Sequence, residues 1–258
     1  RDPSGVRRKF LDPKQDLGLP LSDGHQIILS TSKRKELKRR PRSAEVLLNE
    51  HHTRLFADGT MIHRAHRLIG LYDRQAVEDL GEISIPDGAE ILIARTWKPT
   101  SDGKFQPIAA EDMAEKEAIS LPALKQGAIA EIAYYWVQAP DPRLAPAWTT
   151  PKFYFDSLQG HTHTARYLLR LPSGLKPRIH VTGRQASMTQ PEAGLTTYTL
   201  TQLPRFVSEP LELRPLRRRS SVQVTTLNSW KDYRRIFLER MGQALRVTPH
   251  LRKTVREW

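Results

Sequence analysis

An Asp-Gly pair between two long alternating runs is the feature that most constrains the fold of this 258-residue sequence. Asp58-Gly59 separates residues 45–56 (EVLLNEHHTRLF) from residues 60–72 (TMIHRAHRLIGLY). Such a pair is a strong β-hairpin signal, because both central residues of the tightest hairpin turn adopt positive φ angles. A two-residue turn at Asp58-Gly59 would place His51 opposite His66.

Further short runs of strand type follow the hairpin, each bounded by turn residues. They cover 90–98, 129–138, 152–157, 163–171, 178–182, 196–202 and 221–226, and Ser101-Asp102-Gly103 forms a second hairpin turn. The 19 prolines and 14 glycines also favour a turn-rich chain over a helical bundle. This pattern predicts a mainly β fold, an antiparallel β-sandwich with the 45–72 hairpin at its centre.

A short internal helix and a C-terminal helical segment complete the expected fold. Asp73 can cap a helix over 73–80, and Ser229 can cap one that begins near residue 230. Thr248-Pro249 predicts the start of a second C-terminal helix. The helix after Ser229 carries an apolar stripe of Trp230, Tyr233, Ile236, Phe237 and Met241.

Burying each of these large side chains is worth about 1.5–3 kcal/mol, so we expect the stripe to pack on the sandwich or on a neighbouring domain. Trp230, Tyr233 and Phe237 are therefore candidate docking residues.

The net charge of +13 is concentrated at the two ends of the chain. Residues 1–44 carry a net charge of +7, residues 45–202 of −2 and residues 203–258 of +8. The first segment is interpreted as a basic arm with a short strand at 25–30. Because the middle lacks a basic stripe, nucleic acid is not the expected partner. A polyanion-binding module that uses the basic termini stays as an alternative, with Arg217, Arg218 and Arg219 as candidate binding residues.

The chain offers few of the residues that enzymatic chemistry needs. It has no cysteine, which excludes a thiolate nucleophile, and it contains no nucleophile elbow, P-loop or dinucleotide-binding motif. Histidines occur on the hairpin, at 51, 52, 63 and 66, and as the pair His161 and His163. Zinc needs three or four ligands, and the carboxylates nearest the hairpin histidines, Glu50 and Asp58, do not obviously converge with them. We therefore predict no catalytic residue, no cofactor and no bound metal, with a histidine-based zinc hydrolase as a minor alternative.

Several motifs in the middle of the chain occur in a recognisable order. They are Asp58-Gly59, His66, Gly81-Glu82 with Pro86, Leu92, Arg95-Thr96 with Lys98, Asp102-Gly103, Ser120-Leu121-Pro122 with Leu124, Gly127 and Glu131. This series resembles the bacterial "domain of unknown function 3857" family over roughly residues 20–230. Ala128 departs from it, since the family has an acidic residue after the glycine.

The resemblance implies a β-sandwich domain that precedes a transglutaminase-like, papain-type thiol domain in the same polypeptide. Residues 1–44 would then be a basic arm, 45–227 the sandwich, and 228–258 a helical linker to the downstream domain. The expected role is that of a non-catalytic accessory domain, not itself an enzyme, which positions a protein or envelope substrate or a partner. The family resemblance also implies a periplasmic or envelope-associated location. No apolar run is long enough to span a membrane.

Overall fold

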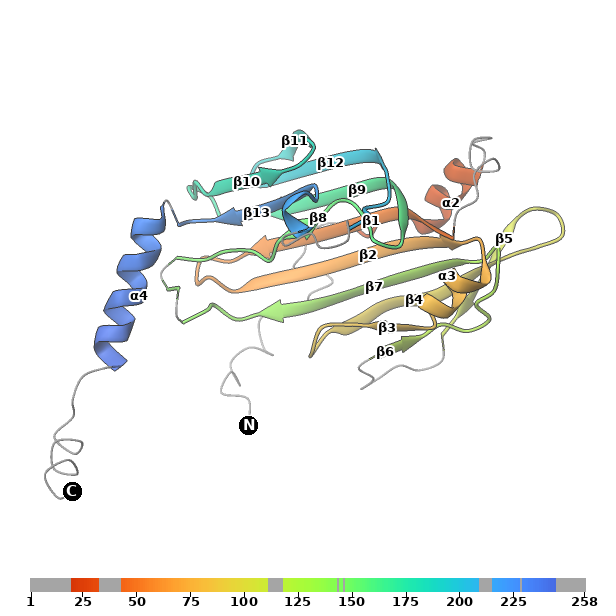
Figure 1. Ribbon diagram of the computed structural model, residues 1–258, viewed down its shortest axis with the longest axis horizontal. Coiled ribbons are helices and arrows are strands. Elements are labelled where there is room, and N and C mark those ends of the chain that lie inside the picture. The colour runs from red at the N-terminus through yellow and green to blue at the C-terminus, as the bar shows by residue number, and fades with distance from the viewer. Residues whose placement is uncertain are drawn as a thin grey trace, which may run out of the picture.

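An eight-stranded sheet forms the centre of the computed structural model, which describes residues 20–32, 43–110, 118–142, 144–145, 147–208, 215–227 and 229–244 (Figure 1). Its strand order is β11-β12-β9-β1-β2-β7-β4-β5. The strands are β1 (Ala44–Leu55), β2 (Met61–Leu71), β4 (Glu90–Pro99), β5 (Phe105–Ala109), β7 (Ile129–Gln138), β9 (Gly160–Arg170), β11 (Ser187–Glu192) and β12 (Leu195–Leu203). The mainly β fold and the central position of the hairpin are confirmed. The sheet is mixed and not antiparallel throughout as predicted, because β1 and β9 run parallel while its other pairs are antiparallel.

A smaller sheet of β10 (Arg178–Thr182), β13 (Ser221–Thr225) and β8 (Phe153–Tyr154) packs on the large one. A shared apolar core joins Phe153 and Val222 of the small sheet to Leu55, Tyr167 and other residues of the large sheet. A two-stranded sheet consists of β3 (Glu82–Ser84) and β6 (Ala118–Ser120). The two packed sheets give the predicted sandwich, with a second layer much smaller than the first.

The central hairpin has a three-residue loop, not the predicted two-residue turn. The Phe56 N–H donates to the Thr60 carbonyl at 2.9 Å, and Gly59 supplies the positive φ of 86°. This loop moves the register by one residue, so His66 faces Glu50. The predicted pairing of His51 with His66 is therefore wrong. A one-residue shift carries a side chain to the other face of the sheet, which separates these two histidines.

The strand expected at 25–30 is a helix, α2 (Gly24–Ser32), which replaces part of the irregular arm. Asp23 caps it, since its Oδ1 accepts from the Gln26 N–H at 3.2 Å. Ile28 is buried in a cluster with residues of β1, β2 and β4, including Leu48 and Trp97. A short apolar run fits either a strand or a helix, and here the cap and the contact with the large sheet select the helix.

The other described helices lie where the sequence predicted them. Helix α3 (Arg74–Asp79) is capped by Asp73, and α4 (Trp230–Ala244) begins after Ser229, whose Oγ accepts from the Asp232 N–H. Figure 1 shows α4 projecting from the strands, and Trp230 is 85% exposed. None of the described helices is long and apolar enough to cross a membrane. The helix predicted from Thr248 lies outside the described residues.

Candidate metal centre

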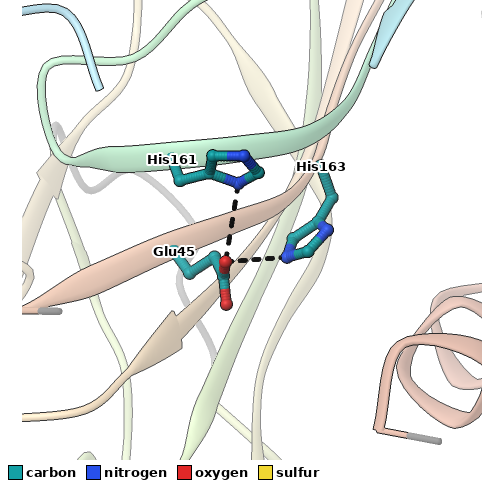
Figure 2. Close-up of side chains that lie close together, drawn as sticks. All are labelled: Glu45, His161 and His163. Carbon is teal, nitrogen blue, oxygen red and sulfur yellow. Dashed lines mark ion pairs between the residues drawn. The ribbon is translucent and has the colours of Figure 1, made fainter. Parts of the chain in front are cut away.

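The parallel pairing of β1 with β9 brings Glu45 beside two histidines. Glu45 on β1 is the register partner of His161, and His163 lies two residues further along β9. Figure 2 shows the three side chains pointing toward one another, with dashed lines from one Glu45 carboxylate oxygen to each of the two rings. Glu45 Oε1 lies 2.8 Å from His163 Nε2 and 3.5 Å from His161 Nδ1. The possible ligand atoms of these three side chains all lie within 4.8 Å of one another, which is close enough to hold a metal ion. Among the described residues, this is the group of three or more acidic or histidine side chains that meets this condition.

Two of these side chains are oriented by further contacts. The Tyr72 hydroxyl donates to Glu45 Oε2 at 3.2 Å, and His163 Nδ1 lies 3.3 Å from the side-chain nitrogen of Gln202. Partners of this kind fix the ring orientation of a ligating histidine and hold a ligating carboxylate in place. These contacts therefore hold the Glu45 carboxylate and the His163 ring in the orientation that the group requires.

The site is buried, with access on one side. The Glu45 side chain is 1% exposed, whereas that of His161 is 17% exposed. Imidazole nitrogens and a carboxylate oxygen suit zinc and related divalent ions. The residues present thus fit a zinc ion with three protein ligands and a path to solvent at His161.

Sequence reasoning identified the His161–His163 pair but missed Glu45. It examined Glu50 and Asp58, which the structure places elsewhere: the Glu50 carboxylate accepts from Ser22 at 2.7 Å, and Asp58 accepts from Thr60 within the hairpin loop. Glu45 is 116 residues before His161 in the sequence. Only the strand pairing connects them, and no local motif carries that information.

The hairpin histidines form a different kind of group. His51 Nε2 lies 3.3 Å from His63 Nδ1, and the two rings contact Trp136, while His51 also contacts Phe153 and Tyr167. Burial lowers the pKa of His63 to about 4 and holds that of His51 well below its usual value, with nearby His63 and His52 adding to the effect on His51. These histidines are neutral core residues.

The residues behind the family resemblance converge in a second buried network. Glu131 accepts from His66 Nε2 at 2.9 Å, from Arg95 Nε at 2.6 Å and from Trp97 Nε1 at 2.6 Å. Burial alone would raise the pKa of Glu131, but these hydrogen bonds and the charge of Arg95 lower it to about 2. Helix α2 covers the network, because Gly24 lies against the Glu131 carboxylate. We interpret these residues as a structural lock between α2 and the sheet.

The predicted arginine cluster is divided by the structure. Arg219 is buried, donates to Asp156 and lies over the Tyr154 ring, whereas Arg217 ends an exposed turn (η3, Pro215–Arg217). Arg218 lies 5.5 Å from the centre of the Phe206 ring. The three side chains thus do not form one open anion-binding patch. Arg219 has a structural role.

The predicted docking residues of α4 are all exposed. Trp230 stands against Tyr233 with ring centroids 5.7 Å apart, and Tyr233 stacks on Phe237 at 6.3 Å. Ile236 on the same helix is buried. The aromatic stripe is available for docking, and its partner stays a prediction.

Comparison with known proteins shows a likeness in fold alone. The sequence matches no protein-family model and no curated protein, so the resemblance to the 3857 family stays a prediction. A "putative protease" from Parabacteroides distasonis ATCC 8503 has a similar structure, with a TM-score of 0.61 and 18% identity over 74% of this chain and 41% of that chain. An M1 zinc metallopeptidase from Deinococcus radiodurans reaches a TM-score of only 0.36 at 16% identity, over 71% of this chain and 42% of that one, and supports no argument. The chain spans less than half the length of either protein.

The prediction that this chain is not an enzyme is overturned by the candidate metal site of Glu45, His161 and His163. That prediction rested on the missing cysteine. The buried Glu45, His161 and His163 group offers a route to hydrolytic chemistry that needs no thiolate, because a bound metal ion can activate water itself. The expectation of no metal ligand rested on the lack of a carboxylate near the histidines. The structure places the Glu45 carboxylate beside His161 and His163, so this reason no longer holds.

Proposed function

We propose that this chain is a zinc-binding β domain of a longer peptide-processing protein, with Glu45, His161 and His163 as the zinc ligands. The observation that carries the proposal is the approach of one carboxylate oxygen to two histidine nitrogens, at 2.8 and 3.5 Å. With three protein ligands, zinc keeps a fourth position for water, which is the arrangement of hydrolytic zinc sites. The peptide substrate is proposed from the fold shared with the "putative protease".

The residues around the ligands support zinc loading. Tyr72 donates to the second Glu45 oxygen and holds the carboxylate, and the partly exposed His161 provides the side from which solvent and substrate approach. For His163 to ligate through Nε2, its Nδ1 must carry the proton. After a 180° rotation of the Gln202 side-chain amide, its oxygen can accept a hydrogen bond from this N–H.

Zinc binding is tested directly by equilibrium dialysis followed by elemental analysis. We expect one zinc ion per chain in the protein without substitutions. Glu45→Gln and His161→Ala should weaken binding by at least tenfold, because each removes one of three ligands. His180→Ala is the matched control, since His180 lies exposed on β10. Zinc content far below one per chain, or equal binding by Glu45→Gln and the parent, would refute the site.

A second candidate function is to position a substrate or partner for a transglutaminase-like domain of the same polypeptide. Two observations favour it: the exposed Trp230–Tyr233–Phe237 stripe of α4, and the match to 41% of a longer protein. The parent gene provides the test. A cysteine after residue 258, followed by a histidine and an aspartate, would support this function, whereas a gene without that cysteine would contradict it.

A further inference from the structure

A cleft of about 420 Å³ lies between the large sheet and residues 151–159. Its walls include Arg67 of β2, Tyr134 of β7, Tyr154 of β8 and Gln159. The volume falls within the range of small-molecule sites, and the mixture of aromatic and polar walls is typical of them. We call it the Arg67 cleft.

Arg67 is a cation without an acidic partner in the described part of the chain. Its Nη2 donates to the neutral Gln159 side chain at 2.8 Å, and its buried Nε has no acceptor. A second cation of the cleft wall, Arg219, acts on it with a charge of the same sign. Burial lowers the pKa of Arg67, the Tyr134 phenol raises it, and Arg219 lowers it further.

Both acidic residues that line the cleft are committed elsewhere. Asp156 accepts from Arg219 Nε at 2.5 Å and from the Ser220 N–H at 2.8 Å. The Glu50 carboxylate lies 3.0 Å from Arg166 and accepts from Ser22. Neither carboxylate pairs with Arg67. Arg67 is partly buried and its charge has no acidic partner among the described residues, so an anion that enters the cleft would remove the cost of that unpaired charge.

We propose that the Arg67 cleft binds the carboxylate group of a small organic ligand, such as the C-terminus of a short peptide. The planar guanidinium suits a carboxylate, which accepts two parallel hydrogen bonds from it. The aromatic walls at Tyr134, Phe153 and Tyr154 contact the apolar part of the ligand. Lys152, which also lines the cleft, adds positive charge. This site is separate from the zinc ligands and does not depend on them.

The binding test uses three probes at fixed ionic strength: N-acetyl-Phe-Ala with a free carboxylate, its C-terminal amide, and inorganic phosphate. The neutral chelator 1,10-phenanthroline is present throughout, so metal binding cannot contribute. Isothermal titration calorimetry should show saturable binding of the free acid and binding at least about tenfold weaker for the amide, as expected when a charge-assisted hydrogen bond is lost. Equal binding of acid and amide, or no binding of the acid, would overturn the proposal. Tighter binding of phosphate would overturn the assignment to a carboxylate.

Two substitutions locate the site. Arg67→Met should abolish binding of the free acid, whereas Arg234→Met, an exposed change on α4, should leave it unchanged. Without ligand, Arg67→Met should keep or raise Tm, because it removes an unpaired charge. Arg219→Met should lower Tm, because it leaves Asp156 without its cation. If Arg67→Met lowers Tm as much as Arg219→Met does, Arg67 is a structural residue and the proposal is wrong.

Discussion

Two buried glutamates of the large sheet, Glu131 and Glu45, each contact histidine, yet their surroundings differ. Glu131 accepts from His66, from the permanent cation of Arg95 and from Trp97, and α2 covers it. The partners of Glu45 include two histidines on one oxygen and a tyrosine on the other, with one histidine partly exposed. The first carboxylate accepts hydrogen bonds from three donors, one of which is a permanent cation. The second can exchange histidine protons for a metal ion.

The comparison teaches that a buried carboxylate–histidine contact does not by itself indicate function. What distinguishes the two sites is the number of histidines on one oxygen and the permanent cation of Arg95 at Glu131. A third group, His51 with His63, contains two histidines but no carboxylate among its described hydrogen-bond partners. It has two histidine nitrogens 3.3 Å apart, but lies within the aromatic core and has neutral partners in Thr53 and Gln138.

The largest loss of stability is expected from a substitution of Glu131. Glu131→Gln removes the charge that Arg95 and His66 share, and breaking a buried pair of this kind costs about 3–5 kcal/mol. Urea unfolding followed by circular dichroism would measure it. Glu78→Gln is the control, because its pair with Arg74 on α3 is exposed and should contribute at most about 0.5 kcal/mol. A loss below about 1 kcal/mol for Glu131→Gln would mean that the network does not lock α2 to the sheet.

The buried neutral histidines and Glu131 should lower the stability of the fold over different ranges of acidic pH. Burial lowers the pKa of His52 to about 3 and that of His63 to about 4, so below pH 6.5 the unfolded chain takes up protons that the folded chain does not. The free energy of unfolding should then fall by about 2 kcal/mol per histidine between pH 6.5 and pH 5. Glu131 contributes in a lower window, where its stabilisation is lost as the pH falls from 4.5 toward 2.

The variant His52→Leu measures how much His52 alone contributes to the loss of stability at acidic pH. Both ring nitrogens of His52 are buried without a hydrogen-bond partner in the described part of the chain, so an apolar replacement should be nearly neutral at pH 7.5. At pH 5 the variant should be more stable than the parent by about 2 kcal/mol. Identical pH profiles for the variant and the parent would show that His52 titrates normally in the fold.

Most strands and helices could be predicted because their signals are local. The alternating runs placed β1 and β2 within one residue of their observed ends, and Asp73 and Ser229 marked the starts of α3 and α4. The apolar run at 25–30 was too short to distinguish a strand from a helix. The hairpin register was wrong by one because an Asp-Gly pair fits both two- and three-residue loops.

The candidate site could be predicted only in part. His161 and His163 were visible as a pair, but their carboxylate comes from a parallel strand more than a hundred residues away. The parallel β1–β9 pairing results from tertiary packing, and an alternating sequence pattern is the same for either strand direction. For the same reason the resemblance motifs named His66, Arg95 and Glu131 without revealing that they meet in one network.

Gly160→Ala should damage the metal centre through the backbone. A Cβ at this position would lie 2.0 Å from the Ala44 carbonyl oxygen, so β1 and β9 would have to separate next to Glu45 and His161. We expect a loss of about 1–3 kcal/mol in stability together with weaker zinc binding. Gly242→Ala in α4 meets open space and should stabilise the helix by up to about 1 kcal/mol, with zinc binding unchanged.

The smallest expected effect is that of His161→Ala in zinc-free protein, and it separates a ligand from a structural residue. His161 is partly exposed and lies 3.5 Å from the carboxylate, so its removal should cost less than about 1 kcal/mol. With zinc at 100 times its Kd, the parent should gain about 2.7 kcal/mol and the variant far less. Thermal unfolding with and without zinc gives both values in one experiment. A large loss in zinc-free protein with no difference on adding zinc would place His161 with the structural histidines His51 and His63.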